Sequence, residues 1–161
     1  MISMWWFTMM ETKYSYHRRG FTLAELVAVI VIISILAGAV SIRIVKTIQK
    51  GRDARRIADI DSLVSALQAY YLDYNQYPDT SGNWTYSTDA NFLSALTSGN
   101  YITQTIQDPK NNSTYRYAYE RKSSANPPYA VIGCTKFEVL DSMGGTVDGI
   151  TLYYYKKLYE R

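Results

Sequence analysis

A single acidic residue, Glu25, stands near the start of an apolar run in this chain of 161 residues. Between Leu26 and Val40 the only polar side chain is that of Ser34. A carboxylate in the hydrocarbon core of a bilayer costs on the order of 2.5–3.5 kcal/mol on insertion scales, so it requires a partner. The chain must therefore supply a partner for Glu25 or obtain one from another molecule.

The residues of the common catalytic sites are scarce in this sequence. The only histidine, His17, precedes the apolar run, and the only cysteine is Cys134. A Ser-His-Asp triad, a Cys-His pair or a histidine-rich zinc site would have no histidine if the N-terminal segment were removed. One cysteine also excludes an intramolecular disulfide. We expect a protein that is not an enzyme, with Cys134 packed as a small core residue.

Charge and composition give little support to nucleic-acid binding. The chain has 17 basic and 14 acidic residues, a formal net charge of +3. Such a balance lacks the broad basic footprint of nucleic-acid-binding proteins, although local patches remain possible. Tyrosine, with 16 residues, is the compositional anomaly. Tyr70, Tyr74 and Tyr77 share a predicted helix face, where packing against a sheet is a simpler interpretation than an adhesive surface.

The apolar run is long enough to cross a membrane. As a helix rising ~1.5 Å per residue, residues 21–45 would span the ~30 Å hydrocarbon core. Beyond it, apolar residues recur at spacings of three and four: Ile57, Ile60, Val64, Leu67, Tyr71 and Tyr74. This period predicts that the helix continues as an amphipathic segment over residues 46–77, until Pro78 ends it.

The sequence predicts that residues 78–161 form a small globular domain with a loop region and about three strands. Asp89 would cap a short helix that ends at Gly99. The strand candidates are rich in β-branched and aromatic residues and cover 115–120, 129–140 and 150–158. A sheet laid on the apolar stripe of the long helix would bury both surfaces. The predicted fold class is α+β, with a long N-terminal helix packed against a small antiparallel sheet.

The N-terminal segment resembles that of type IV pilins and of the pseudopilins of type II secretion systems. The likeness rests on RRGFTLAEL followed by the apolar helix, and it extends to YYLDYNQYP at the predicted helix end. It implies a leader of residues 1–20, with basic Arg18 and Arg19, that a prepilin peptidase cuts between Gly20 and Phe21. Phe21 would be N-methylated, and Glu25 would be the fifth residue of the mature chain.

By this resemblance, cleavage supplies the partner that Glu25 needs. The new α-ammonium of Phe21 has a reference pKa of about 7.7–8.0 and is largely charged near neutral pH. Within one chain Glu25 lies four residues along the same helix face; between chains, the ammonium of an incoming subunit would meet Glu25 of its predecessor. We favour the second arrangement, because it sets an axial register that apolar side chains alone do not.

The resemblance also implies a structural subunit of a homo-oligomeric helical filament, either a type IV pilus or a type II secretion pseudopilus. The partners would be the prepilin peptidase, which is also the methyltransferase, a membrane platform protein, an assembly ATPase and membrane lipid. The subunit would cross the cytoplasmic membrane once, with its domain outside the cytoplasm. The positive-inside rule favours the opposite orientation, because Lys and Arg are more numerous after the run than before it; here the leader resemblance decides.

Three further interpretations stay open. A minor pilin that binds DNA would use Arg121, Lys122, Lys156 and Lys157, which interleave with tyrosines, although solvated strand faces look the same. A monomeric anchored domain would never polymerise. Asp141 and Asp148 flank a glycine-rich loop in a region where the major pseudopilin binds calcium, but two carboxylates are few for an ion that takes six to eight oxygens, and a plain turn is simpler. No other metal or cofactor is expected.

Overall fold

The computed structural model describes residues 20–160, apart from the side chains of residues 39–42. Most of the predicted leader, with Arg18 and Arg19, therefore lies outside the described residues. By its internal contacts the chain divides into two units, residues 1–40 and 41–161.

Helix α1 spans Leu23–Tyr74. It contains a stretch long and apolar enough to cross a membrane, and the described side chains of that stretch are exposed, with Leu23 at 80% and Ile35 at 67%. An exposed apolar surface of this extent is unfavourable in water, so lipid or another protein must cover it. The helix ends three residues earlier than the sequence predicted, because Asn75 takes a left-handed conformation with φ 53° and its N–H donates to the carbonyl of Tyr71 at 2.8 Å.

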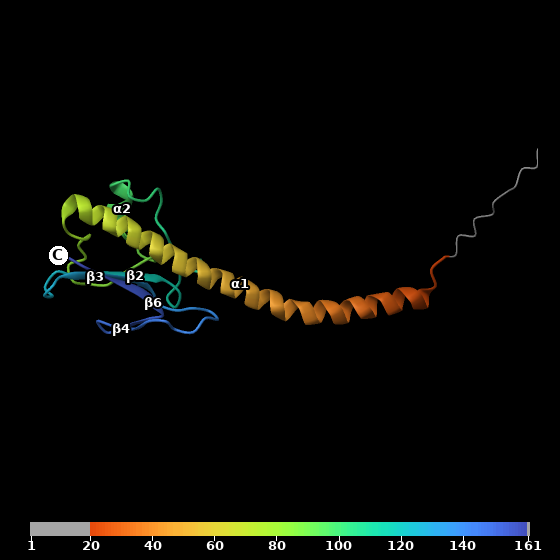
Figure 1. Cartoon of the computed structure of the whole chain (residues 1–161). Helices are drawn as coiled ribbons and strands as arrows, with labels where there is room; N and C mark the ends of the chain where they lie inside the picture. The colour runs from red at the N-terminus through yellow and green to blue at the C-terminus, as the bar shows by residue number, and fades with distance from the viewer. Residues whose placement is uncertain (1–19, 161) are drawn as a thin grey trace, which may run out of the picture. The chain divides into compact units, whose positions relative to one another are not determined.

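The remaining elements form a small domain beside the C-terminal part of α1 (Figure 1). Four strands make an antiparallel sheet in the order β1-β2-β3-β6, and two make a separate hairpin, β4-β5. The elements after α1 are β1 (Thr85–Tyr86), α2 (Ser94–Ser98), β2 (Tyr117–Lys122), β3 (Tyr129–Cys134), β4 (Gly145–Val147), β5 (Ile150–Leu152) and β6 (Tyr154–Tyr159). The predicted α+β class is confirmed.

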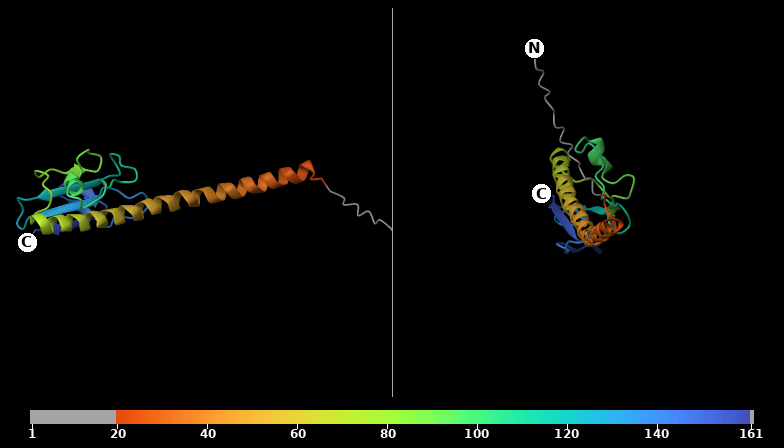
Figure 2. Two further views of the ribbon diagram at one scale, coloured as in Figure 1. Left: turned by 90° about the horizontal axis from the view of Figure 1, so that it is seen from above. Right: turned by 90° about the vertical axis from the view of Figure 1, so that its right-hand side faces the viewer.

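Alternation along the central strands divides the core between the two faces of the sheet. Tyr117, Tyr119 and Ile132 pack with the fully buried Ile60, Leu63 and Leu67 of α1. On the opposite face, Ala118 and Val131 pack with Leu152 of β5. In the views of Figure 2 the strands again lie alongside the C-terminal part of α1. Each such buried aliphatic side chain contributes roughly 1.5–3 kcal/mol, so the helix and sheet stabilise one another.

Three local predictions were wrong in detail. Strand β3 stops at Cys134 rather than continuing to residue 140, because the backbone that follows turns toward α1. The predicted strand over 150–158 is broken at Tyr153 into β5 and β6. Asp89 does not cap α2; it accepts a hydrogen bond from the backbone of Tyr86 at 2.8 Å, and α2 begins after Leu93 without a side-chain cap.

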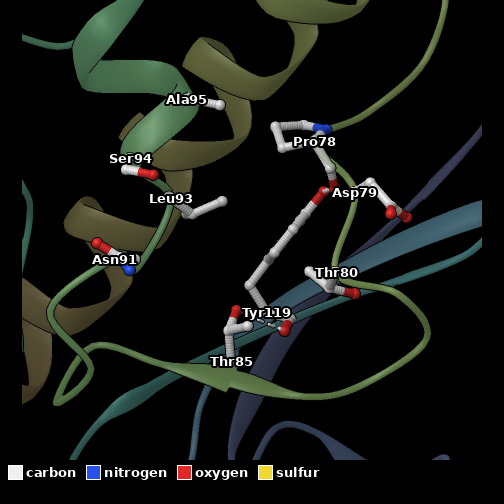
Figure 3. Close-up of a pocket in the computed structure, with 9 residues that line it drawn as sticks. All are labelled: Pro78, Asp79, Thr80, Thr85, Asn91, Leu93, Ser94, Ala95 and Tyr119. Atoms are coloured by element: carbon white, nitrogen blue, oxygen red, sulfur yellow. Dashed lines mark hydrogen bonds between the residues drawn. The ribbon is translucent and has the colours of Figure 1, made fainter.

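A pocket lies between the segment after α1, the start of α2 and the sheet (Figure 3). The side chain of Tyr119 crosses the pocket, and its hydroxyl donates a hydrogen bond to the carbonyl of Pro78 at 2.8 Å. Burial raises the pKa of Tyr119 well above its ordinary value, so the phenol stays protonated. Asp79 is the one carboxylate in the lining, and neither His nor Cys lines it. The lining therefore lacks the paired groups that acid–base or nucleophilic chemistry requires.

Candidate functional site: the helix start and the domain's ion pairs

The predicted processing and assembly residues lie together where α1 begins. Gly20 and Phe21 precede the helix and are exposed. The carboxylate of Glu25 turns back and accepts hydrogen bonds through Oε2 from the backbone N–H and the hydroxyl of Thr22, at 2.8 and 2.9 Å. The Thr22 hydroxyl in turn accepts from the N–H of Glu25 at 3.2 Å. These reciprocal bonds are a capping box, and they hold the carboxylate beside the residue that follows Phe21.

Thr22 is a residue of this site that the sequence reasoning missed. The signal was present, since a threonine followed three residues later by a glutamate at the start of an apolar helix is the capping-box pattern. The chain therefore supplies one partner for Glu25 from its own helix start. Among the described residues, Oε1 of Glu25 accepts no hydrogen bond, so it remains available to a further donor.

The four basic residues that the DNA-binding alternative would use do not form one surface. They lie on β2 and β6, which β3 separates. Alternation places Arg121 and Lys156 on the sheet face toward α1 and Lys122 and Lys157 on the other. Arg121 forms two hydrogen bonds with Glu160, at 2.7 and 3.1 Å, and Lys122 pairs with Glu120 at 2.6 Å. The charges of Arg121 and Lys122 are therefore balanced by carboxylates within the domain.

The two weak calcium candidates, Asp141 and Asp148, share no common contact among the described residues. Asp148 occupies the turn of the β4-β5 hairpin with φ 48°, and its carboxylate accepts a hydrogen bond from the Tyr129 hydroxyl at 2.8 Å. Asp141 is exposed and has no hydrogen bond or ion pair among the described residues. No group of three or more His, Cys, Asp or Glu side chains is arranged for a metal within the described part of the chain.

The tyrosines at the end of α1 and the single cysteine make packing contacts within the domain. Tyr77 is buried and stacks on Tyr71 with ring centroids 4.9 Å apart, while Tyr70 stacks on Tyr74. Tyr74 keeps half of its surface exposed. Cys134 is fully buried, as predicted, and burial raises its thiol pKa to about 12, so it carries no reactive thiolate at neutral pH.

A cluster of charged side chains joins α1 to two loops of the domain. Arg52 binds the carboxylate of Glu138 through two nitrogens, both at 2.6 Å. Arg56, fully buried, binds Asp108 through two nitrogens at 2.6 and 2.9 Å. It reaches Asp53 at 2.8 Å and Glu138 at 3.2 Å as well. The ion-pair cluster consists of Arg52, Asp53, Arg56, Asp108, Lys110 and Glu138.

Asp53 and Arg56 are not among the apolar residues that the helical period identified, but both are fully buried. They precede Ile60 at helical spacings of seven and four, so they share its face. Charged side chains that are fully buried need oppositely charged or hydrogen-bonding partners for all of their polar atoms. The missed signal was this face, which continues from Leu67 through Leu63 and Ile60 into two charged residues.

Ion pairing within the cluster shifts its pKa values in the stabilising direction. Hydrogen bonds from Arg52 lower the pKa of Glu138 to about 2, with help from Lys110 and Arg56 and against the opposing effect of burial. Burial alone would lower the pKa of Arg56, but hydrogen bonds to Asp108, Glu138 and Asp53 outweigh it and raise that pKa. Glu138 and Arg56 therefore stay charged at neutral pH.

The low pKa of Glu138 predicts a specific loss of stability in acid. A carboxylate whose folded pKa is about 2 against an ordinary 4.5 stabilises the fold above pH 4.5, and this contribution is lost as pH falls toward 2. We expect Glu138→Gln to flatten this part of the curve of unfolding free energy against pH by on the order of 3 kcal/mol. Denaturant titrations at several pH values measure it, and Asp141→Asn, at an exposed carboxylate, should follow the wild type. A curve for Glu138→Gln that falls as steeply as the wild type would contradict the assignment.

Comparison with known proteins finds a family match for each of two successive parts of the chain. Residues 16–41 match the family described as "Prokaryotic N-terminal methylation motif". Residues 43–135, more than half of the chain, match "Type II secretion system (T2SS), protein G". No solved structure matches the chain.

Three relatives, each named type II secretion system core protein G, illustrate the similarity. The protein of Pectobacterium carotovorum subsp. carotovorum is 45% identical over 65 residues, which are 40% of this chain and 42% of that protein. The protein of Aeromonas hydrophila is 31% identical over 134 residues, 81% of this chain and 83% of the relative. The protein of Escherichia coli (strain K12) is 34% identical over 99 residues, 59% and 68%.

These matches agree with the capping box at the helix start, the exposed apolar half of α1 and the helix-on-sheet domain. The chain therefore belongs to the type II secretion system protein G family, as a structural pseudopilin with a prepilin-type N-terminus and not as an enzyme.

Proposed function

We propose that this chain is cleaved between Gly20 and Phe21 and polymerises into a pseudopilus, with Glu25 as the carboxylate that sets the register between subunits. The observation that carries the proposal is the orientation of Glu25. Its Oε2 is bonded to Thr22, adjacent to the future N-terminus, and its Oε1 takes no hydrogen bond among the described residues. An ammonium from a neighbouring copy would complete the set of donors around this carboxylate.

The exposed apolar half of α1 supports the same function. In the cytoplasmic membrane, lipid would cover side chains such as Ile30 and Leu36, which are more than half exposed within one chain. In a filament, the same half of α1 from other copies would replace that lipid. The helix serves both states because its surface is apolar all round.

The domain boundaries follow from this proposal. Residues 1–20 would be the leader, 21–45 the membrane-spanning part of the helix, 46–77 its extracytoplasmic part with the turn that follows, and 78–161 the domain outside the membrane. A prepilin peptidase that also methylates Phe21, a membrane platform protein and an assembly ATPase would act on the chain. The chain itself would contribute contacts and no chemistry.

Mass spectrometry of the protein from cells that contain a prepilin peptidase tests the processing step. We expect a mass that corresponds to residues 21–161 plus one methyl group. Gly20→Val should leave the full-length mass, because a branched side chain would then stand at the bond that the peptidase is proposed to cut. The structure places nothing within 4 Å of the Cβ that a substitution would add, so the folded domain should melt as in the wild type.

Cleavage at any bond other than the one before Phe21 would contradict the proposal, since Glu25 would then no longer be the fifth residue of the mature chain. Efficient cleavage of Gly20→Val would remove the role of Gly20 alone.

A further inference from the structure

The segment over residues 135–144, between β3 and β4, raises the question of what holds it in place. Like the major pseudopilin's calcium loop, it precedes the last strands, and the family match ends where it begins. It has no regular secondary structure. Irregular backbone against a packed helix requires partners for its N–H groups.

The residues here do not fit a calcium site. Calcium takes six to eight oxygens in one shell. The Asp148 carboxylate is bonded to Tyr129 in a hairpin turn, and Asp141 is exposed. The hydroxyl of Ser142 accepts from the N–H of Gly144 at 3.4 Å within its own segment. These oxygens do not converge on one point with any third acidic side chain in the described part of the chain.

Asp53 of α1 supplies the backbone partners instead. Its carboxylate accepts hydrogen bonds from three successive N–H groups, those of Glu138 at 2.8 Å, Val139 at 2.8 Å and Leu140 at 3.1 Å. Asp53 is itself fully buried. One helix carboxylate thus fixes three consecutive backbone units, which a metal ion would do through their carbonyl groups.

Side chains on both sides complete the attachment. Glu138, from the segment itself, takes bonds from Arg52 and Arg56 of α1 and from Lys110 at 2.9 Å. Asp108 holds the loop that carries Lys110, through Arg56. The cluster contains three carboxylates and three cations. Its formal charge is therefore balanced without a divalent ion, and its carboxylate oxygens already face cations or backbone N–H groups.

We propose that the ion-pair cluster performs in this chain the role of a structural calcium ion, fixing the 135–144 segment to α1 by arginine and lysine contacts. The proposal goes beyond the proposed function and does not depend on polymerisation. It implies that the domain keeps its structure whether calcium is present or removed.

The test uses the full-length chain in detergent and thermal unfolding followed by the near-ultraviolet signal of its tyrosines. One sample contains about 10 mM calcium chloride, above the 10⁻⁴–10⁻³ M dissociation constants of extracellular sites, and the other contains EGTA at matched ionic strength. We expect the two midpoints to agree within about 1 °C. A rise of several degrees with calcium, as mass action requires for an ion that binds the folded state alone, would overturn the proposal.

Hydrogen exchange measured by mass spectrometry locates the attachment. In Asp53→Asn we expect at least about tenfold faster exchange at the amides of residues 138–140, because a neutral amide replaces their common acceptor. Asp61→Asn is the matched control on the same helix, since Asp61 is exposed and accepts a hydrogen bond from the Tyr154 hydroxyl at 2.9 Å. It should leave these amides protected. Unchanged exchange in Asp53→Asn would contradict the proposal without relying on a melting temperature.

The double variant Asp141→Asn/Asp148→Asn separates the two explanations further. If the cluster holds the segment, amides 138–140 keep their protection in this variant, with or without calcium. The opposite result is that the double variant loses protection at these amides, while calcium increases their protection in the wild type only. That result would assign the segment to a metal site and refute the role of the cluster.

Discussion

Replacing Glu25 with valine is expected to abolish filament assembly while cleavage before Phe21 continues. The substitution removes the acceptor for an incoming ammonium, and it makes the helix more favourable in lipid by on the order of 2.5–3.5 kcal/mol. Both effects keep the subunit in the membrane. We expect at least about a tenfold loss of sheared filaments, which corresponds to a loss of only about 1.4 kcal/mol per contact. Electron microscopy and quantification of the filament fraction measure it, with mass spectrometry on the retained subunit.

Ser34→Ala provides the control within the same apolar half of α1. The Ser34 hydroxyl donates to the carbonyl of Ile30 at 2.7 Å, so its hydrogen bond is satisfied inside its own helix. This variant should assemble normally. Thr22→Val removes the two capping-box hydrogen bonds of the Thr22 hydroxyl but keeps the carboxylate, and we expect an intermediate loss. Normal filaments from Glu25→Val would refute the pairing between subunits, and failure of Ser34→Ala would show that assembly responds to any polar change.

Arg56→Gln is expected to produce the largest loss of domain stability among single changes in the ion-pair cluster. The side chain is fully buried and contacts Asp53, Asp108 and Glu138. Removing one partner of a buried ion pair leaves uncompensated charge and costs about 3–5 kcal/mol. Denaturant unfolding of the full-length chain in detergent, followed by tyrosine fluorescence, gives the free-energy difference.

Arg55→Gln is the matched control, because Arg55 is the adjacent residue, is 65% exposed and makes a single pair with Asp59 at 3.5 Å. It should change the unfolding free energy by less than about 1 kcal/mol. In the double variant Arg56→Met/Asp108→Leu we expect part of the stability to return, since Asp108 no longer remains as a buried carboxylate without its arginine. Equal effects of Arg55→Gln and Arg56→Gln would show that burial of the cluster does not control stability.

Local signals in the sequence account for most of the helix. Its apolar run, the three-and-four spacing of Ile60 and Leu67 and the terminating effect of Pro78 are properties of neighbouring residues, and neighbours share one helix face. The end at Tyr74 differed by three residues because Asn75 tolerates a left-handed conformation, a choice between two local options of similar energy.

Strand boundaries were less predictable. Residues 135–140 have strand-like composition, yet the N–H groups of residues 138–140 bond to Asp53, more than eighty residues earlier in the chain. A strand preference of about 1 kcal/mol is smaller than the cost of leaving buried carboxylates unpaired. Within the glycine-rich stretch before Ile150, residues 145–147 form β4 because they pair with β5. That hairpin packs against Ala118 and Val131 of the four-stranded sheet, which no local pattern indicates.

By itself the sequence determined the candidate N-terminal site, because Gly20, Phe21 and Glu25 lie within six residues and a helix start needs no distant contact to arrange them. Only the capping role of Thr22 was recognised first in the structure. The helical period places Asp53 and Arg56 on the buried face, but only the tertiary structure decided which residues of the two loops meet them there. Buried charge is tolerated only where residues from separate loops converge on it, and no local pattern contains that convergence.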